Sequence, residues 1–154
     1  MKTQATYDDA ELILRLYDLR REPLMRTARK WMGGAPVFTS REHWLTVCPP
    51  GSDENAYYRQ VTTYWDMAAA FVVTGVLNRE LFYRANNMEL LFVWEKVKQL
   101  VPELRAVNKS PLTLHNMEEV ANGFIAFLAE NAPGFYEQWS GNIAKGAAPP
   151  PRPA

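Results

Sequence analysis

Apolar residues recur at helical spacing through the stretch from residue 57 to residue 74. The residues that set this pattern, at intervals of 4, 3, 4 and 3, are Tyr57, Val61, Tyr64, Ala68 and Phe71. Because an α-helix has about 3.6 residues per turn, this spacing places all of their side chains on one face. Trp65 and Val72 widen that face on one side. The pattern predicts a central helix in contact with several others.

Three further segments repeat this spacing and set the expected fold class. They cover residues 7–21, 90–104 and 114–128. No segment alternates polar and apolar residues over enough positions to favour a strand. Seams of this kind are characteristic of helices that cross at about 20°. We therefore predict an all-α fold, an antiparallel helical bundle of about four main helices with short accessory helices.

Short motifs indicate where the first helices begin and end. Thr6, followed three residues later by Asp9, has the form of a helix N-cap with an acidic residue at position N3. Pro23 either opens a second helix at its first position or kinks one longer helix. Gly33 and Gly34 then end this segment, because glycine is favoured just beyond a helix C-terminus.

Similar signals frame the central helix. Residues 39–42, Thr-Ser-Arg-Glu, have the form of a capping box for a short helix that precedes it. Ser52 or Asp53 supplies the N-cap of the central helix, and Gly75 follows its last periodic residue with an expected positive φ. Asn78 is then the expected N-cap of another short helix.

In the C-terminal half of the chain, proline and capping residues indicate the helix boundaries. Pro102 should kink or restart the helix that carries it, since proline has no backbone N–H to donate. Ser110, with Thr113 as the competing candidate, is the expected N-cap of the next helix. Gly123 within that helix is expected to permit a close helix approach, and Pro133 to open a last helix.

The length and composition favour one globular domain. The 154 residues are 47% hydrophobic and 22% charged, close to the average of globular proteins. We assign residues 1–145 to a single helical domain, and residues 146–154 to a disordered Pro-rich tail that has no apolar side chains large enough to form a core.

The charge and the hydropathy pattern bear on partners and location. Seventeen basic residues balance seventeen acidic ones, which argues against nucleic acid as the main partner. The longest apolar run, residues 67–77, is far shorter than the roughly 20 residues of a membrane-spanning helix. The chain begins without the apolar run of a signal peptide, and its one cysteine, Cys48, has no partner for an internal disulfide. We therefore expect a cytoplasmic protein with no membrane contact.

The residue types that carry chemistry are sparse. His115 and Glu118 share a helical face, but a di-iron carboxylate site needs Glu-x-x-His on two helices and two further glutamates, and the other histidine is His43. Cys48 lies in a proline-rich stretch without the G-x-S-x-G motif of a nucleophile elbow. We predict no catalytic residues, no metal and no cofactor, and lean toward a protein that is not an enzyme.

A cluster of basic residues is the strongest charge feature. Between residues 15 and 30, six basic residues stand against two acidic ones. The candidates for binding an anion or an acidic partner are Arg20, Arg21, Arg26, Arg29 and Lys30. The alternative is a solvated face with ion pairs to Glu95, Glu118 or Glu119.

Aromatic residues supply the second candidate site. Tyr64, Trp65 and Trp94 are the predicted wall of a pocket, with Tyr57 and Tyr58 beside them. The alternative is that these rings only pack in the core.

Three blocks of sequence carry a resemblance to a known group. They are residues 20–32 (RREPLMRTARKWM), 59–82 (RQVTTYWDMAAAFVVTGVLNRELF) and 87–105 (NMELLFVWEKVKQLVPELR). The chain resembles, over about two thirds of its length, a group of uncharacterised bacterial helical domains. The resemblance implies an all-helical domain of unknown function and assigns no functional residue.

Two hypotheses for the function follow. The first is a non-enzymatic module that acts through protein contacts, in its simplest form a homo-oligomer, with residues 24–32 and the C-terminal helix as candidate surfaces. The second is a bundle that binds a small anionic metabolite. A cavity of roughly 300 Å³ or more with convergent polar groups would favour the second.

Overall fold

The structure, a computed structural model, describes residues 4–146 and contains helices but no strand within them. The helices are α1 (Tyr7–Arg20), α2 (Pro23–Gly34), α3 (Arg41–Val47), α4 (Asp53–Val73), α5 (Arg79–Arg84), α6 (Met88–Val97), α7 (Val101–Asn108), α8 (His115–Asn131) and α9 (Phe135–Gly146). The predicted all-α class is confirmed. The expected tail, residues 146–154, lies outside the described residues except for Gly146.

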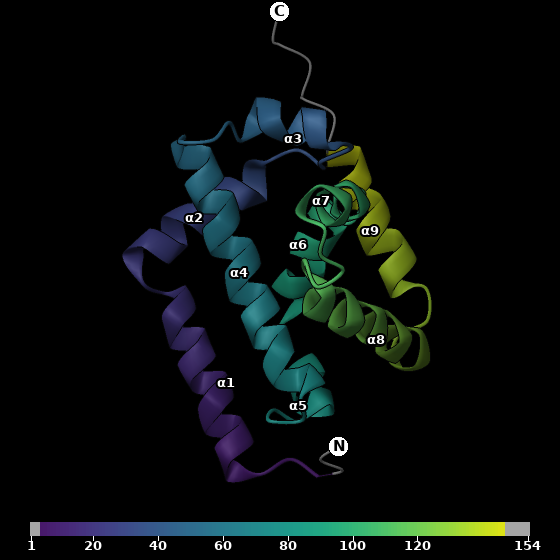
Figure 1. Cartoon of the computed structure of the whole chain (residues 1–154). Helices are drawn as coiled ribbons and strands as arrows, with labels where there is room; N and C mark the ends of the chain where they lie inside the picture. Colours follow the sequence, from purple (N-terminus) through teal and green to yellow (C-terminus); the bar gives the residue numbers. More distant parts are fainter. Residues whose placement is uncertain (1–3, 147–154) are drawn as a thin grey trace, which may run out of the picture.

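The central position of α4 is also confirmed. Figure 1 shows α1 beside α4 and running in the opposite direction, α2 crossing α4 obliquely, and α6, α8 and α9 on the side of α4 away from α1. The closest packing of α4 is with α2 and α8. Val61, Ala68 and Ala69 of α4 are fully buried. Because α4 is covered on two sides, its buried surface is wider than one stripe and includes Tyr58.

The remaining helices complete the core around α4. The segment that contacts α4 most closely is α2, whereas the main neighbours of α1 are α2 and α5. On the other side, α6 and α9 both pack against α8. Lysine and glutamate side chains of α6, Lys96 and Glu95, are buried together with its apolar residues. Helix α2 therefore packs in the core of the bundle together with the main helices expected from the sequence.

Local motifs predicted several helix ends correctly. The capping box between Thr6 and Asp9 begins α1, and Ser52 and Asn78 cap α4 and α5 with their side chains. Pro23 begins α2 as a separate helix. Gly75 has the expected positive φ, 81°.

Other boundaries of the C-terminal half differ from the prediction. Neither Ser110 nor Thr113 caps α8, which begins at His115 after Leu114 in the left-handed conformation with φ 51°. The last helix begins at Phe135 and not at Pro133. Pro102 agrees with the prediction, because α6 ends at Val97 and the chain restarts at Val101 as a separate helix, α7.

Two further predictions concern Gly123 and membrane contact. A side chain at Gly123 would collide with the hydroxyl of Tyr83 from α5, so the close approach there is to a tyrosine side chain and not to another helix backbone. Within residues 4–146 every helix is too short or too polar to cross a membrane.

Candidate functional site

The basic cluster predicted from the sequence is divided by the fold. Arg20 is buried, and its guanidinium carbon lies 5.1 Å from the centre of the Trp65 ring. Arg29 pairs with Glu89, with 2.9 Å between its Nε and both carboxylate oxygens. Only the other three candidates, Arg21, Arg26 and Lys30, are exposed. Arg20 and Arg29 are therefore part of the packing between helices.

The acidic partners expected for this cluster are engaged elsewhere. Glu95 pairs with Lys98, with 2.7 Å between Oε2 and Nζ. Glu118 pairs with Arg105 and Glu119 with Arg79. The alternative ion pairs of the basic cluster to these glutamates are therefore not formed in the described residues, where Arg29 pairs with Glu89 of α6 instead.

The predicted aromatic wall lies in the core. Tyr64 and Trp65 make an edge-to-face pair with ring centres 5.0 Å apart, and Trp94 is also buried. The Tyr64 hydroxyl donates to the Leu16 carbonyl over 2.5 Å, and burial raises the pKa of Tyr64 to about 12. None of these three residues lines either of the two surface hollows described below.

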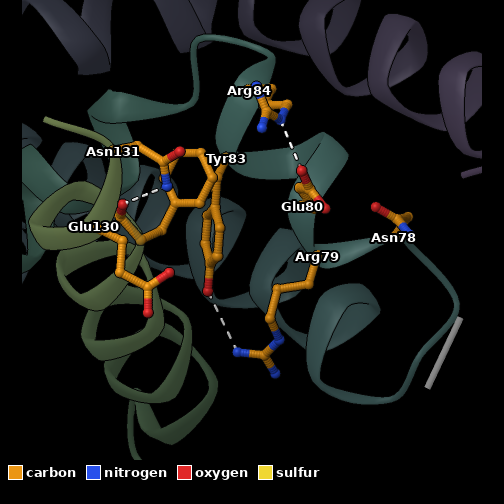
Figure 2. Close-up of a pocket in the computed structure, with 8 residues that line it drawn as sticks. Asn78, Arg79, Glu80, Tyr83, Arg84, Glu130 and Asn131 are labelled. Atoms are coloured by element: carbon orange, nitrogen blue, oxygen red, sulfur yellow. Dashed lines mark hydrogen bonds and ion pairs between the residues drawn. The ribbon is translucent and has the colours of Figure 1, made fainter. Parts of the chain in front are cut away.

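One hollow lies between α5 and α8 and has a volume of about 420 Å³. The residues that line it are Asn78, Arg79, Glu80, Tyr83, Arg84, Phe127, Glu130 and Asn131. Figure 2 shows that Arg84 bonds to Glu80 and that Arg79 bonds to the Tyr83 hydroxyl. Arg79 also pairs with Glu119 at 3.1 Å. Both cations of this hollow already have ion-pair partners, which leaves little charge for a ligand, although the Nε of Arg79 is buried without a hydrogen bond in the described residues.

The second hollow, which we call the α3–α4–α7 pocket, has a volume of about 470 Å³. Its lining residues are Arg41, Trp44, Leu45, Pro50, Asn55, Tyr58, Arg59, Thr62, Thr63, Leu104, Val107, Asn108, Thr113 and Leu114. This volume is within the range of pockets for small molecules, which are mostly apolar with a few placed polar groups. The volume is also above the roughly 300 Å³ that we set as the lower limit for a metabolite site.

Two buried hydrogen-bond donors of this pocket have no partner. Tyr58 is only 5% exposed, and its hydroxyl makes no hydrogen bond within the described residues. The indole Nε1 of Trp44 is likewise buried and unbonded. The two rings meet edge to face, with centres 5.3 Å apart. An unsatisfied buried polar group costs about 1 to 3 kcal/mol, so two on one pocket call for an explanation.

The protonation of Tyr58 is fixed by its surroundings. Burial, with a smaller contribution from the nearby Cys48, raises the pKa of Tyr58 well above its usual value. Its hydroxyl therefore keeps its proton in the physiological range. Burial also raises the pKa of Cys48 to about 12, which leaves this thiol protonated and a poor nucleophile.

Two arginines line the pocket without an ion-pair partner in the described part of the chain. Arg59 uses its Nε to donate to the Asn55 side chain at 3.0 Å, and its remaining N–H groups have no partner within residues 4–146. The Arg41 guanidinium makes no hydrogen bond there. Glu103 accepts a hydrogen bond from the backbone N–H of Arg41 at 3.1 Å, and not from its guanidinium. No acidic residue lines the pocket itself.

The sequence predicted only some of the residues of this pocket. Tyr58 was among the aromatic residues considered for a pocket, whereas Arg41, Arg59 and Trp44 were not. Arg41 and Trp44 stand three residues apart in the short helix that the capping box predicts, and so share one face. That spacing, with the similar spacing of Asn55, Tyr58 and Thr62 on α4, was the available signal. The opposite wall comes from α7, which only the fold brings near.

Groups that could hold a metal ion or act as a nucleophile do not come together in residues 4–146. No three His, Cys, Asp or Glu side chains are close enough there to bind a metal. The α3–α4–α7 pocket contains donors and an apolar wall, but no acid–base pair. This arrangement is suited to binding.

Comparisons with known proteins agree with the resemblance seen in the sequence. The family model described as a domain of unknown function (DUF4760) matches residues 5–124. No curated protein and no solved structure matches the chain. All residues that line the α3–α4–α7 pocket fall within the matched range.

Proposed function

We propose that this chain, which belongs to the DUF4760 family of domains of unknown function, binds a small organic molecule in the α3–α4–α7 pocket. One observation carries the proposal: the Tyr58 hydroxyl and the Trp44 indole N–H are buried without partners on side chains that line the same pocket. A ligand acceptor that reaches either group would remove the cost of leaving that donor unbonded.

The shape and lining of the pocket support a small molecule as the ligand. Its volume of about 470 Å³ suits a compact organic molecule, and Leu45, Leu104 and Val107 offer apolar contacts. The donors lie below the surface, where the flat face of a protein partner does not reach. We propose binding without catalysis, because no general acid and base face each other in the pocket.

A pocket-filling variant tests this function. Thr63 is an exposed residue at the pocket, and Thr63→Trp should fill it. Thr46→Trp is the matched control, because Thr46 is exposed, bonds to the carbonyl four residues earlier as Thr63 does, and does not line the pocket. Fragments that raise the melting temperature of the wild type should act equally on Thr46→Trp and lose their effect on Thr63→Trp.

Fluorescence gives a second, independent readout. Trp44 lines the pocket, so a bound molecule should change the indole emission of the wild type but not that of Trp44→Phe. If a broad fragment library shifts neither the melting temperature nor the Trp44 emission, small-molecule binding in this pocket is wrong.

Protein contact, the first hypothesis from the sequence, has one supporting observation. Tyr7, Leu14 and Tyr17 are at least half exposed at intervals of 7 and 3 residues, which places them on one outer face of α1. Residues 24–32 offer less apolar surface to a protein partner, because Met25, Ala28 and Met32 pack inward. Light scattering of the wild type and of Leu14→Glu/Tyr17→Glu tests this: a dimer that the double variant dissociates would support it, and a monomeric wild type would contradict it.

A further inference from the structure

The charge of the α3–α4–α7 pocket narrows the chemistry of its ligand. The pocket is lined by Arg41 and Arg59 and by no acidic residue. Neither guanidinium has an ion-pair partner in the part of the chain that the structure describes. Two unpaired guanidinium groups beside an apolar surface attract an anion, and arginine is the residue best suited to bind carboxylate or phosphate through two hydrogen bonds.

Several side chains of the pocket offer hydrogen-bond donors, whereas Asn108 donates its amide N–H to Thr113 and keeps its amide oxygen as an acceptor. Asn55 uses its amide N–H to bond to the Cys48 carbonyl at 3.0 Å, and its amide oxygen accepts from Arg59. Tyr58 keeps its proton because burial raises its pKa, and the indole nitrogen of Trp44 only donates. The site thus offers several donors to a ligand rich in acceptors.

We infer that the ligand of the α3–α4–α7 pocket is an organic anion, in which an apolar body carries a carboxylate or phosphate group. This inference rests on the function proposed above. The anionic group binds Arg41 and Arg59, and the buried donors of Tyr58 and Trp44 bind its oxygens or a second acceptor atom on the body. Leucine and valine side chains of α3 and α7 contact the apolar part.

Matched probes of one shape and different charge test the inference. 2-Naphthoate and 2-naphthyl phosphate carry the anion, 2-naphthamide replaces it with a neutral group, and inorganic phosphate lacks the apolar body. Titration calorimetry on the full chain should show that the carboxylate or the phosphate ester binds at least about tenfold more tightly than the amide. Inorganic phosphate alone should bind far more weakly.

Substitution of the two arginines assigns the effect to the pocket. Arg41→Gln/Arg59→Gln should bring the affinity for the anionic probe to that for the amide, and leave the amide affinity unchanged. Arg15→Gln/Arg26→Gln removes the same number of charges from exposed positions outside the pocket and should preserve the anion preference. Raising the salt concentration should weaken binding of the anionic probe and leave binding of the amide unchanged, because salt screens interactions between charges.

The outcomes separate this inference from the proposed function. Equal binding of naphthoate, naphthyl phosphate and naphthamide to the wild type, blocked by Thr63→Trp, would overturn the anionic ligand and keep the binding function. Inorganic phosphate that binds as tightly as the organic anions would also overturn it. No binding of any probe, together with the failure of the fragment library, would overturn both.

Discussion

Asp66 of α4 accepts a hydrogen bond from the backbone N–H of Met117, 2.9 Å away, and a second from the Asn116 side chain at 3.2 Å. Helix α8 begins two residues before Met117, and its N-cap residue, Leu114, has no side chain that can accept. Asp66 therefore takes the place of a local N-cap and joins α8 to the central helix. Its negative charge is also favourable at a helix N-terminus.

Removal of this carboxylate should destabilise the fold. Asp66→Ala should lower the free energy of unfolding by about 1 to 2 kcal/mol, the usual effect of losing a helix cap. Asp66→Asn should lower the free energy of unfolding by less, because the amide oxygen of asparagine can still accept the hydrogen bond from the Met117 N–H. Urea unfolding followed by circular dichroism measures both, with the exposed Asp18→Ala as control. A loss in Asp66→Ala no larger than that in the control would contradict the capping role.

The Asp66 contact also explains which helix ends the sequence could predict. Thr6 and Ser52 bond to N–H groups three residues away, so their motifs are complete within a few positions. The cap of α8 comes from a residue 51 positions before Met117. No local motif contains that information. The sequence therefore favours Ser110 or Thr113, the capping residue types that lie nearest to the start of the helix.

The candidate sites were less predictable than the fold, again because of tertiary contacts. A run of basic residues treats Arg20 and Arg26 alike, but the contact of α1 with α4 buries Arg20 against Trp65 and leaves Arg26 exposed. Tyr58 and Trp44 are separate in the sequence, and whether their polar atoms find partners depends on packing. Helical spacing predicts which face is apolar, but not which buried polar group stays unbonded.

Gly123 of α8 should tolerate no side chain while Tyr83 is present. Gly123→Ala places a methyl group against the Tyr83 hydroxyl and should cost about 1 to 3 kcal/mol of stability, as overpacking does. The control is Gly141→Ala in α9, where a methyl group meets nothing and should be neutral or stabilising.

A double-mutant cycle identifies Tyr83 as the cause. Tyr83→Phe removes the colliding oxygen and should recover part of the loss in Gly123→Ala, so the two changes should not be additive. Thermal or urea unfolding of the four proteins gives the coupling free energy. Strict additivity would show that the cost arises elsewhere in α8.

Tyr64 should make stability depend on alkaline pH. Its folded pKa, about 12, lies above the ordinary value of 10.0, so the folded state holds the proton more tightly than the unfolded state does. The stabilisation is fully present below about pH 10 and is lost as pH rises toward the folded pKa. Tyr64→Phe, which lacks the hydrogen bond to Leu16, should be less stable at neutral pH by about 1 kcal/mol.

The difference between the two proteins should therefore shrink in alkali. Unfolding in urea at about pH 7, 10 and 11 measures it, and the subtraction removes effects common to both proteins, such as those of the other buried tyrosines. Tyr7→Phe is the control for loss of a phenol from an exposed position. A difference between wild type and Tyr64→Phe that grows with pH would contradict the assigned direction of the shift.

The exposed part of the basic cluster should attract anions independently of the pocket. Arg26 and Lys30 lie on the outer side of α2, away from its buried residues, while Arg29 is held by Glu89 and by the Arg20 carbonyl at 3.1 Å. Arg26→Glu/Lys30→Glu should abolish salt-sensitive retention on a heparin matrix and leave the helical circular dichroism unchanged. Wild-type protein that elutes without salt dependence would show that this surface is only solvated.

Arg29→Glu should instead lower the free energy of unfolding by about 1 to 3 kcal/mol, because it faces Glu89 with a like charge and leaves a carbonyl unbonded. An Arg29→Glu variant of unchanged stability would show that the Glu89 pair does not hold α2 to α6.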